Sequence, residues 1–142
     1  MSKPILGITM GDPASIGPEI TVKALARREV YDQCRPLVVG DAGMLEKARK
    51  LVGHEEIRIH PVSEVKDALF MPGTIDVYDM KLVDAEKLPI GQVSVEAGNA
   101  AFQYVKKVIE LANDDEVDGT VFGCILSGQS GFRFCRRFGC FR

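Results

Sequence analysis

A glycine- and proline-rich loop at residues 10–17 has the residue types of an anion-binding turn, Met-Gly-Asp-Pro-Ala-Ser-Ile-Gly. Gly11 and Gly17 lack a Cβ, so the backbone can turn tightly or approach a ligand closely there. Asp12 can accept hydrogen bonds from the hydroxyl of a ribose or of a substrate. A helix beginning near Gly17 would add free N–H groups and positive potential.

The flanking segments place this loop at the end of a strand. Residues 4–9 (PILGIT) are a short apolar run with β-branched residues, which predicts a buried strand. Pro18 suits the first turn of a helix that extends to about Arg28, because its missing N–H would be unbonded there anyway. The loop is neither a G-x-G-x-x-G fingerprint nor a P-loop. Its spacing alone leaves two interpretations open, a tight strand-to-helix connection and a ligand-binding turn.

Strands and helices alternate along the rest of the chain. The predicted strands are residues 36–40, 56–60, 73–79 and 120–126, the predicted helices are 42–52 and 95–112, and residues 85–92 are a loop. Asp41 and Ser94 are the predicted N-caps of the two helices. Asp76 and Asp79 alternate with apolar residues, which predicts the solvent-facing side of a strand, and Tyr104 falls on the apolar stripe of its helix. This order predicts an α/β fold with a largely parallel sheet.

Two segments resemble one known family. Residues 10–20 (MGDPASIGPEI) resemble the GDPAGIGPE signature of the 4-hydroxythreonine-4-phosphate dehydrogenase (PdxA) family, and residues 91–102 resemble its GxxSxExGxAA segment. Residues 38–41 (VVGD) also fit, and the resemblance runs in order from about residue 3 to residue 121. Ser15 stands where most members have glycine. It indicates a sub-group that acts on other 4-phosphorylated sugar acids, such as threonate or erythronate 4-phosphate.

The resemblance implies a fold, a reaction and an oligomeric state. The fold would be a three-layer sandwich like that of isocitrate and isopropylmalate dehydrogenases. The reaction would be the NAD-dependent oxidation, with decarboxylation, of a 4-phosphorylated hydroxy acid, assisted by a divalent metal (Zn, Mg or Co) acting as a Lewis acid. The residues expected to bind the cofactor are Gly11, Asp12, Ile16 and Gly17. Full-length family members form homodimers. A cytoplasmic location is expected for a separate reason, since the start of the chain lacks the features of a secretory signal.

The sequence departs from the family after the segment Thr120-Val121. Family members are more than twice as long, and their substrate residues and three metal-binding histidines lie beyond this point. This chain has no histidine after His60. We therefore assign no catalytic residue and no metal ligand, and we expect the chain alone to be inactive. The alternative to an enzyme is a non-catalytic fragment that binds an anion or nucleotide weakly at residues 10–17.

The composition also changes near residue 119. Four of the 18 basic residues, none of the 20 acidic ones and five of the seven Phe lie in residues 119–142. We therefore divide the chain into residues 1–121, the amino-terminal α/β region, and residues 122–142, a divergent basic-aromatic tail. One interpretation of this tail is a frameshifted end of the coding sequence, which we favour. The other is an arm that binds nucleic acid or a membrane surface.

Overall composition excludes several classes of protein. The 142 residues are 46% hydrophobic and 27% charged, with a net charge of −2. These values exclude an extended disordered chain and argue against a general nucleic-acid binder. No apolar run approaches the length of a membrane span, and the start lacks the features of a secretory signal. The four cysteines have no zinc-site spacing, so free thiols are expected. Isolated from its relatives' remaining strands, the chain is expected to expose apolar edges.

Overall fold

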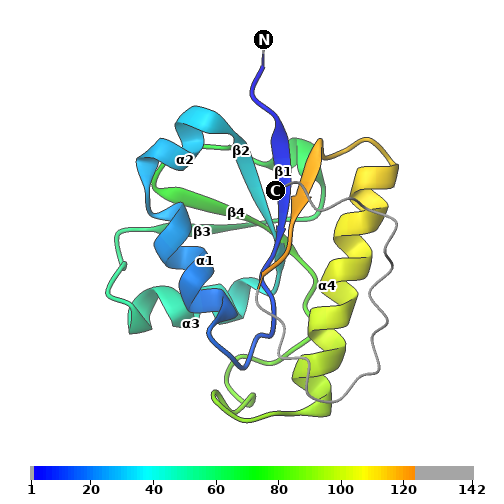
Figure 1. Cartoon of the computed structure of the whole chain (residues 1–142). Coiled ribbons are helices and arrows are strands. Elements are labelled where there is room, and N and C mark those ends of the chain that lie inside the picture. Colours follow the sequence, from blue (N-terminus) through cyan, green and yellow to red (C-terminus); the bar gives the residue numbers. More distant parts are fainter. Residues whose placement is uncertain (1, 124–142) are drawn as a thin grey trace.

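The computed structural model describes residues 2–123 and contains one five-stranded sheet in which every strand pair is parallel (Figure 1). The strand order is β3-β4-β2-β1-β5. The strands are β1 (Ile5–Thr9), β2 (Arg35–Gly40), β3 (Arg58–Val62), β4 (Thr74–Asp79) and β5 (Gly119–Val121). This topology confirms the predicted α/β fold with a parallel sheet.

Helices cover both faces of the sheet. They are α1 (Gly17–Leu25), α2 (Arg28–Gln33), α3 (Ala42–Leu51) and α4 (Val95–Asn113), with a short 3-10 turn at Val65–Asp67. Figure 1 shows α1, α2 and α3 on one side and α4 on the other. Within the described residues, no helix is long and apolar enough to cross a membrane.

The central strands are apolar because helices cover both of their faces. In β2, the residues from Pro36 to Gly40 are all buried, and Leu37, Val38 and Val39 are fully enclosed. β1 lies between β2 and β5, with Ile8 opposite Val38 on one side and Val121 on the other. The core therefore lies around β1 and β2, and the loops at their ends are held on a rigid base.

The sequence prediction for α4 is confirmed. The Ser94 hydroxyl accepts a hydrogen bond from the Ala97 N–H at 3.1 Å and so caps the helix. Ala97, Tyr104, Val108 and other residues of the predicted stripe are buried against the sheet. Local capping and helical periodicity agree at this element, which is why both ends of the helix were predictable.

Two local predictions need correction. The helix predicted up to about Arg28 ends at Leu25, because Arg27 is extended (φ −81°, ψ 119°), and a second helix that was not predicted, α2, begins at Arg28. Asp76 is not on a solvent-facing side, since it is 1% exposed. Its carboxylate accepts hydrogen bonds from the Leu69 and Phe70 amides at 3.0 and 2.8 Å and contacts His60 Nδ1 at 2.7 Å. The chain following β3 folds back over Asp76 and removes it from solvent.

The predicted boundary at residue 121 falls at the end of β5, where Val121 and Phe122 are about half exposed. The tail prediction falls on residues that are mostly outside the described range, which ends at Gly123. Of the four cysteines, Cys34 lies in the described range, where it is a buried free thiol.

Candidate functional site

The carboxyl ends of β1, β2 and β4 meet at one edge of the sheet, where α1, α3 and α4 begin (the lower end in Figure 1). Ligands of open α/β sheets bind outside this edge. Three segments lie there: the β1–α1 loop at residues 10–16, Asp41 between β2 and α3, and the connection from β4 to α4 at residues 80–94. We name the last segment the 80–94 strap.

The β1–α1 loop is held by hydrogen bonds of its own. Asp12 Oδ1 accepts from the Ala14 N–H at 2.8 Å, and the Asp12 carbonyl accepts from the Ser15 N–H at 3.2 Å. The Met10 N–H donates to the Val39 carbonyl at 3.0 Å. Asp12 is 7% exposed. Its carboxylate therefore shapes the turn, and its predicted role as acceptor for a ribose or substrate hydroxyl remains a prediction.

The fold requires glycine at both positions 11 and 17 of the predicted site, for different reasons. Gly11 has φ of +80°, a conformation that side chains disfavour. A Cβ on Gly17 would lie 2.3 Å from the Met10 carbonyl oxygen, so Gly17 is required by close approach to this chain's own backbone. The structure thus brings Gly11, Asp12 and Gly17 together in one buried turn.

The first turn of α1 offers backbone donors at this edge. Ile16 occupies the N-cap position, is 51% exposed, and makes no side-chain cap. Pro18 has no N–H, so the first turn offers the amides of Gly17 and Glu19, which have no intrahelical acceptor. The Glu19 side chain adds a negative charge at the positive end of the helix dipole, which competes with an anionic ligand.

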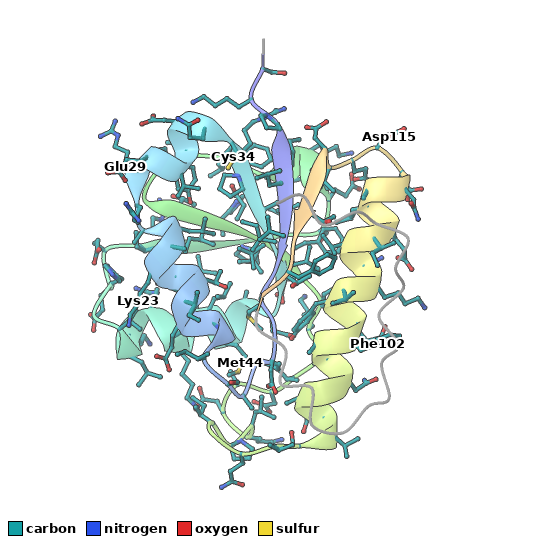
Figure 2. All side chains as sticks on the ribbon, in the orientation of Figure 1. Lys23, Glu29, Cys34, Met44, Phe102 and Asp115 are labelled. Atoms are coloured by element: carbon teal, nitrogen blue, oxygen red, sulfur yellow. The ribbon has the colours of Figure 1, made fainter. Side chains whose placement is uncertain are left out.

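A small hollow lies beside this turn. Its volume is about 10 Å³, about the size of one water molecule. The lining residues come from the loop and α1 (Pro13, Ser15, Pro18, Glu19), from α3 (Met44, Ala48, Leu51) and from the strap (Ile90). Figure 2 shows Met44 at the lower end of the molecule, beside this loop. The hollow admits no nucleotide phosphate in this arrangement, so any larger ligand must bind outside it or move the strap.

Asp41 is the most enclosed carboxylate of this edge, at 3% exposure. It is the residue before α3, as predicted, but its side chain does not cap that helix. Its Oδ1 accepts from the Leu82 and Val83 amides at 2.7 and 3.3 Å, and its Oδ2 accepts from the Tyr104 hydroxyl. The predicted capping role of Asp41 is therefore wrong, because its two carboxylate oxygens bind the strap amides and the Tyr104 hydroxyl instead.

Asp79, at the end of β4, binds the amino-terminal end of α3, which the Asp41 side chain does not cap. Asp79 Oδ1 accepts from the Ala42 N–H at 3.2 Å, the first amide of α3. The same oxygen lies 3.4 Å from the Lys81 amide at the start of the strap. Asp79, at the end of β4, thus binds the start of α3, which follows β2. Asp41, which follows β2, binds the strap that follows β4.

Burial is the main electrostatic influence on this pair. It raises the pKa of Asp41 above its ordinary value, and the hydrogen bonds from Tyr104, Val83 and Leu82 offset only part of that rise. Burial, together with the hydrogen bond to Asp41, also raises the pKa of the Tyr104 hydroxyl. Tyr104 therefore stays a proton donor, and Asp41 ionises less readily than an exposed carboxyl.

Metal-ligating side chains do not gather at this edge. Among residues 2–123, no group of three or more His, Cys, Asp or Glu side chains is arranged to hold a metal ion. The described chain offers helix-end amides to a phosphate but no ligand set for the implied divalent cation.

Sequence reasoning missed the roles of Asp41, Asp79 and Tyr104. Tyr104 was expected as core packing, which is correct for its ring, but its hydroxyl has a buried partner. The available signal was position, because Asp41 and Asp79 each end a buried strand and such residues meet at one edge in a parallel sheet. The strap amides that complete the cluster have no sequence signature.

Comparison with known proteins gives a consistent result. Residues 32–129, more than half of the chain, match the family model described as "Pyridoxal phosphate biosynthetic protein PdxA". A protein of Cupriavidus necator named D-threonate 4-phosphate dehydrogenase is 45% identical over 115 residues, which cover 81% of this chain and 34% of that protein.

Solved structures agree with the sequence match. A 4-hydroxythreonine-4-phosphate dehydrogenase from Burkholderia phymatum has a TM-score of 0.83 and 45% identity, over 86% of this chain and 36% of that one. The enzyme of that name from Klebsiella pneumoniae has a TM-score of 0.79 and 31% identity, over 87% of this chain and 38% of that one. The chain spans about a third of the length of these relatives. Sequence and fold together place the chain in the PdxA family.

Proposed function

We propose that this chain forms the amino-terminal α/β part of an oxidoreductase that oxidises a 4-phosphorylated hydroxy acid with NAD as hydride acceptor. The observation that carries the proposal is the likeness, over 86% of the chain, to a 4-hydroxythreonine-4-phosphate dehydrogenase. The predicted homodimer, which rests on the family resemblance, and the predicted cytoplasmic location are part of the same proposal.

The substrate we favour is a threonate-type acid. Ser15 replaces the glycine of the usual signature, and the Cupriavidus necator relative is named for D-threonate 4-phosphate. Ser15 is half-buried, lines the hollow at the start of α1 and precedes Gly17 by two residues. A serine in place of glycine adds a donor and acceptor and removes backbone freedom at this point of the loop.

The part of the site that this chain supplies is a rigid anion-facing edge. The Gly17 and Glu19 amides and the positive end of the α1 dipole would contribute donors to a phosphate group. Asp12, Asp41 and Asp79 keep the loops in place through backbone amides. Residues 2–123 hold no ligand set for a divalent metal, so we derive no step through one.

A second candidate is a non-catalytic chain that binds an anion or a nucleotide weakly at residues 10–17. The observation that favours it is that residues 2–123 hold no group of three or more side chains arranged to ligate a metal ion. Effective catalysis requires substrate and metal to be held in one geometry, and one helix end does not achieve this.

The experiment compares turnover with binding on the same 142-residue chain. NADH formation is followed with D-threonate 4-phosphate or 4-hydroxythreonine 4-phosphate, each with Mg²⁺ or Zn²⁺. Turnover with the threonate ester supports the proposed enzyme. Amide shifts confined to residues 10–19 on adding NAD⁺, without turnover, support the second candidate. If neither turnover nor such shifts occur, both are wrong.

A further inference from the structure

The 80–94 strap connects two features of the carboxyl edge that are distant in sequence. It has no helix or strand and runs from the end of β4 to the cap of α4. At its beginning, the Leu82 and Val83 amides donate to Asp41 Oδ1 at 2.7 and 3.3 Å. Near its end, the Gly91 amide donates to the Ala14 carbonyl of the β1–α1 loop at 2.7 Å.

Between these contacts the strap is stiffened internally. Asp84 binds its own turn, because its Oδ1 accepts from the Glu86 amide at 3.0 Å and its carbonyl accepts from the Leu88 amide at 2.9 Å. Leu88 is 3% exposed and belongs to the core. Lys47 Nζ of α3 donates to the Ala85 carbonyl at 3.0 Å. These contacts hold residues 84–88 in one turn between the two ends of the strap.

The beginning of the strap depends on one hydroxyl. Tyr104 is 0% exposed and its hydroxyl donates to Asp41 Oδ2, the oxygen that the strap amides do not use. Without that donor, Asp41 Oδ2 would be buried and unpaired. A buried acceptor without a partner is unfavourable, so the carboxylate would leave its position to find solvent. Leu82 and Val83 would then lose their acceptor.

We propose that Tyr104 and Asp41 are positioning residues that, through the 80–94 strap, set the conformation of the β1–α1 loop. The pair holds Leu82 and Val83, the strap holds Gly91 against Ala14, and Ala14 fixes the turn that Asp12 shapes. The strap also supplies Ile90 to the hollow at the start of α1. Release of the pair would therefore loosen the loop and open that hollow. The link to ligand binding rests on the proposed function.

The test is amide hydrogen exchange of the full chain, with Tyr104→Phe against Tyr31→Phe as the matched control. Tyr31 is also buried and donates to a backbone carbonyl, that of Thr74, at the opposite edge of the sheet. Exchange is read relative to the core amides of β2, so a general loss of stability cancels.

In Tyr104→Phe, we expect the Leu82, Val83 and Gly91 amides to exchange about five- to tenfold faster, the effect of losing one buried hydrogen bond. Tyr31→Phe should leave all three unchanged. Faster exchange at Leu82 and Val83 with no change at Gly91 would overturn the proposal, as would no change at any of them.

A measurement on the unmodified chain covers the case in which Tyr104→Phe does not fold. Exchange is followed in increasing, sub-denaturing urea, and the three strap amides must share one opening free energy below that of global unfolding. Separate values for Gly91 and for Leu82 would overturn the proposal. Neither measurement uses a ligand, so failure of NAD⁺ to shift residues 10–19 would count against the proposed function alone.

Discussion

Gly17, the first residue of α1, packs closely against the Met10 carbonyl oxygen. A Cβ there would lie 2.3 Å from that oxygen and 3.4 Å from the Asp12 carbonyl oxygen. Because both neighbours are backbone atoms of a buried turn, neither can rotate away as a flexible side chain would. The glycine that looks like part of a ligand-binding motif is thus first a requirement of the fold.

Gly17→Ala is therefore expected to lower the free energy of unfolding by about 2 kcal/mol or more, because the loop must shift to admit the methyl group. The matched control is Gly98→Ala. Gly98 is an exposed glycine within α4 where a Cβ would meet nothing within 4 Å, and the substitution should raise stability by about 0.5–1 kcal/mol. Urea unfolding measures both. Equal effects of the two substitutions would contradict the account of Gly17.

The buried carboxyl of Asp41 predicts a specific dependence of stability on pH. Burial raises its pKa in the folded chain, so the folded state holds the Asp41 proton to a higher pH than the unfolded state. The stabilisation of the folded state by proton binding at Asp41 is therefore fully present below the ordinary carboxyl pKa. It is lost as the pH rises through the raised pKa of the folded chain. Asp41→Asn keeps an oxygen acceptor and does not titrate.

Relative to Asp41→Asn, the unmodified chain should lose stability with rising pH in that window, by at most about 1.4 kcal/mol per pH unit. Urea unfolding of both proteins across acidic to neutral pH measures the difference, and all other titrating groups cancel. If the stability of the unmodified chain relative to Asp41→Asn stays constant or increases as the pH rises, burial does not control the pKa of Asp41.

At the scale of elements, α4 depends on a local cap as well as on packing. The Ser94 hydroxyl accepts from the Ala97 amide, and the apolar stripe binds the helix to β1, β2 and β5. Ser94→Ala should lower the free energy of unfolding by about 1 kcal/mol, the usual contribution of an N-cap. Ser63→Ala, at an exposed serine between β3 and the 3-10 turn, should change it little. A thermal or urea midpoint unchanged in Ser94→Ala would contradict the capping role.

Elements with a strong local signal were predictable from sequence, and those decided by tertiary contacts were not. The apolar runs of β1 and β2 and the stripe of α4 each gave the right element near the right residues. No glycine or proline separates α1 from α2, so the local sequence carries no signal for the end of α1. Asp76 alternates like a solvent-facing residue, but the returning chain at Leu69 and Phe70 covers it.

The candidate site follows the same division. The β1–α1 loop was predictable because glycine, proline and aspartate there restrict the backbone in recognisable ways. Asp41 was predicted at the right position with the wrong partner, since its acceptor role depends on the strap some forty residues later. Hydrogen bonds to backbone amides of irregular segments leave no pattern of residue types.

At the scale of the whole molecule, the part of the sheet formed by residues 2–123 ends at a short strand. β5 has three residues, pairs only with β1 in the described part of the chain, and carries Val121 and, just beyond it, Phe122 about half exposed. Edge strands with apolar side chains promote association between chains. The sequence-based expectation that the isolated chain exposes apolar edges therefore stays a prediction, which this strand allows to be tested.

Val121→Lys should therefore shift the chain toward monomer in size-exclusion chromatography, because a charge on an edge strand disfavours pairing. Val93→Lys is the matched control, since Val93 is 70% exposed on the strap and receives the same charge. If both substitutions act equally, added charge alone explains the change. If the unmodified chain is already a monodisperse monomer, the edge does not drive association.

We propose that the carboxyl edge of this sheet, at the start of α1, faces a phosphate-bearing ligand. The most direct measurement is an amide NMR titration of the 142-residue chain with NAD⁺, and separately with D-threonate 4-phosphate. The account predicts saturable shifts centred on Gly17 and Glu19. Shifts absent from residues 10–19, or centred on Tyr31 and Arg35 at the opposite edge, would contradict it.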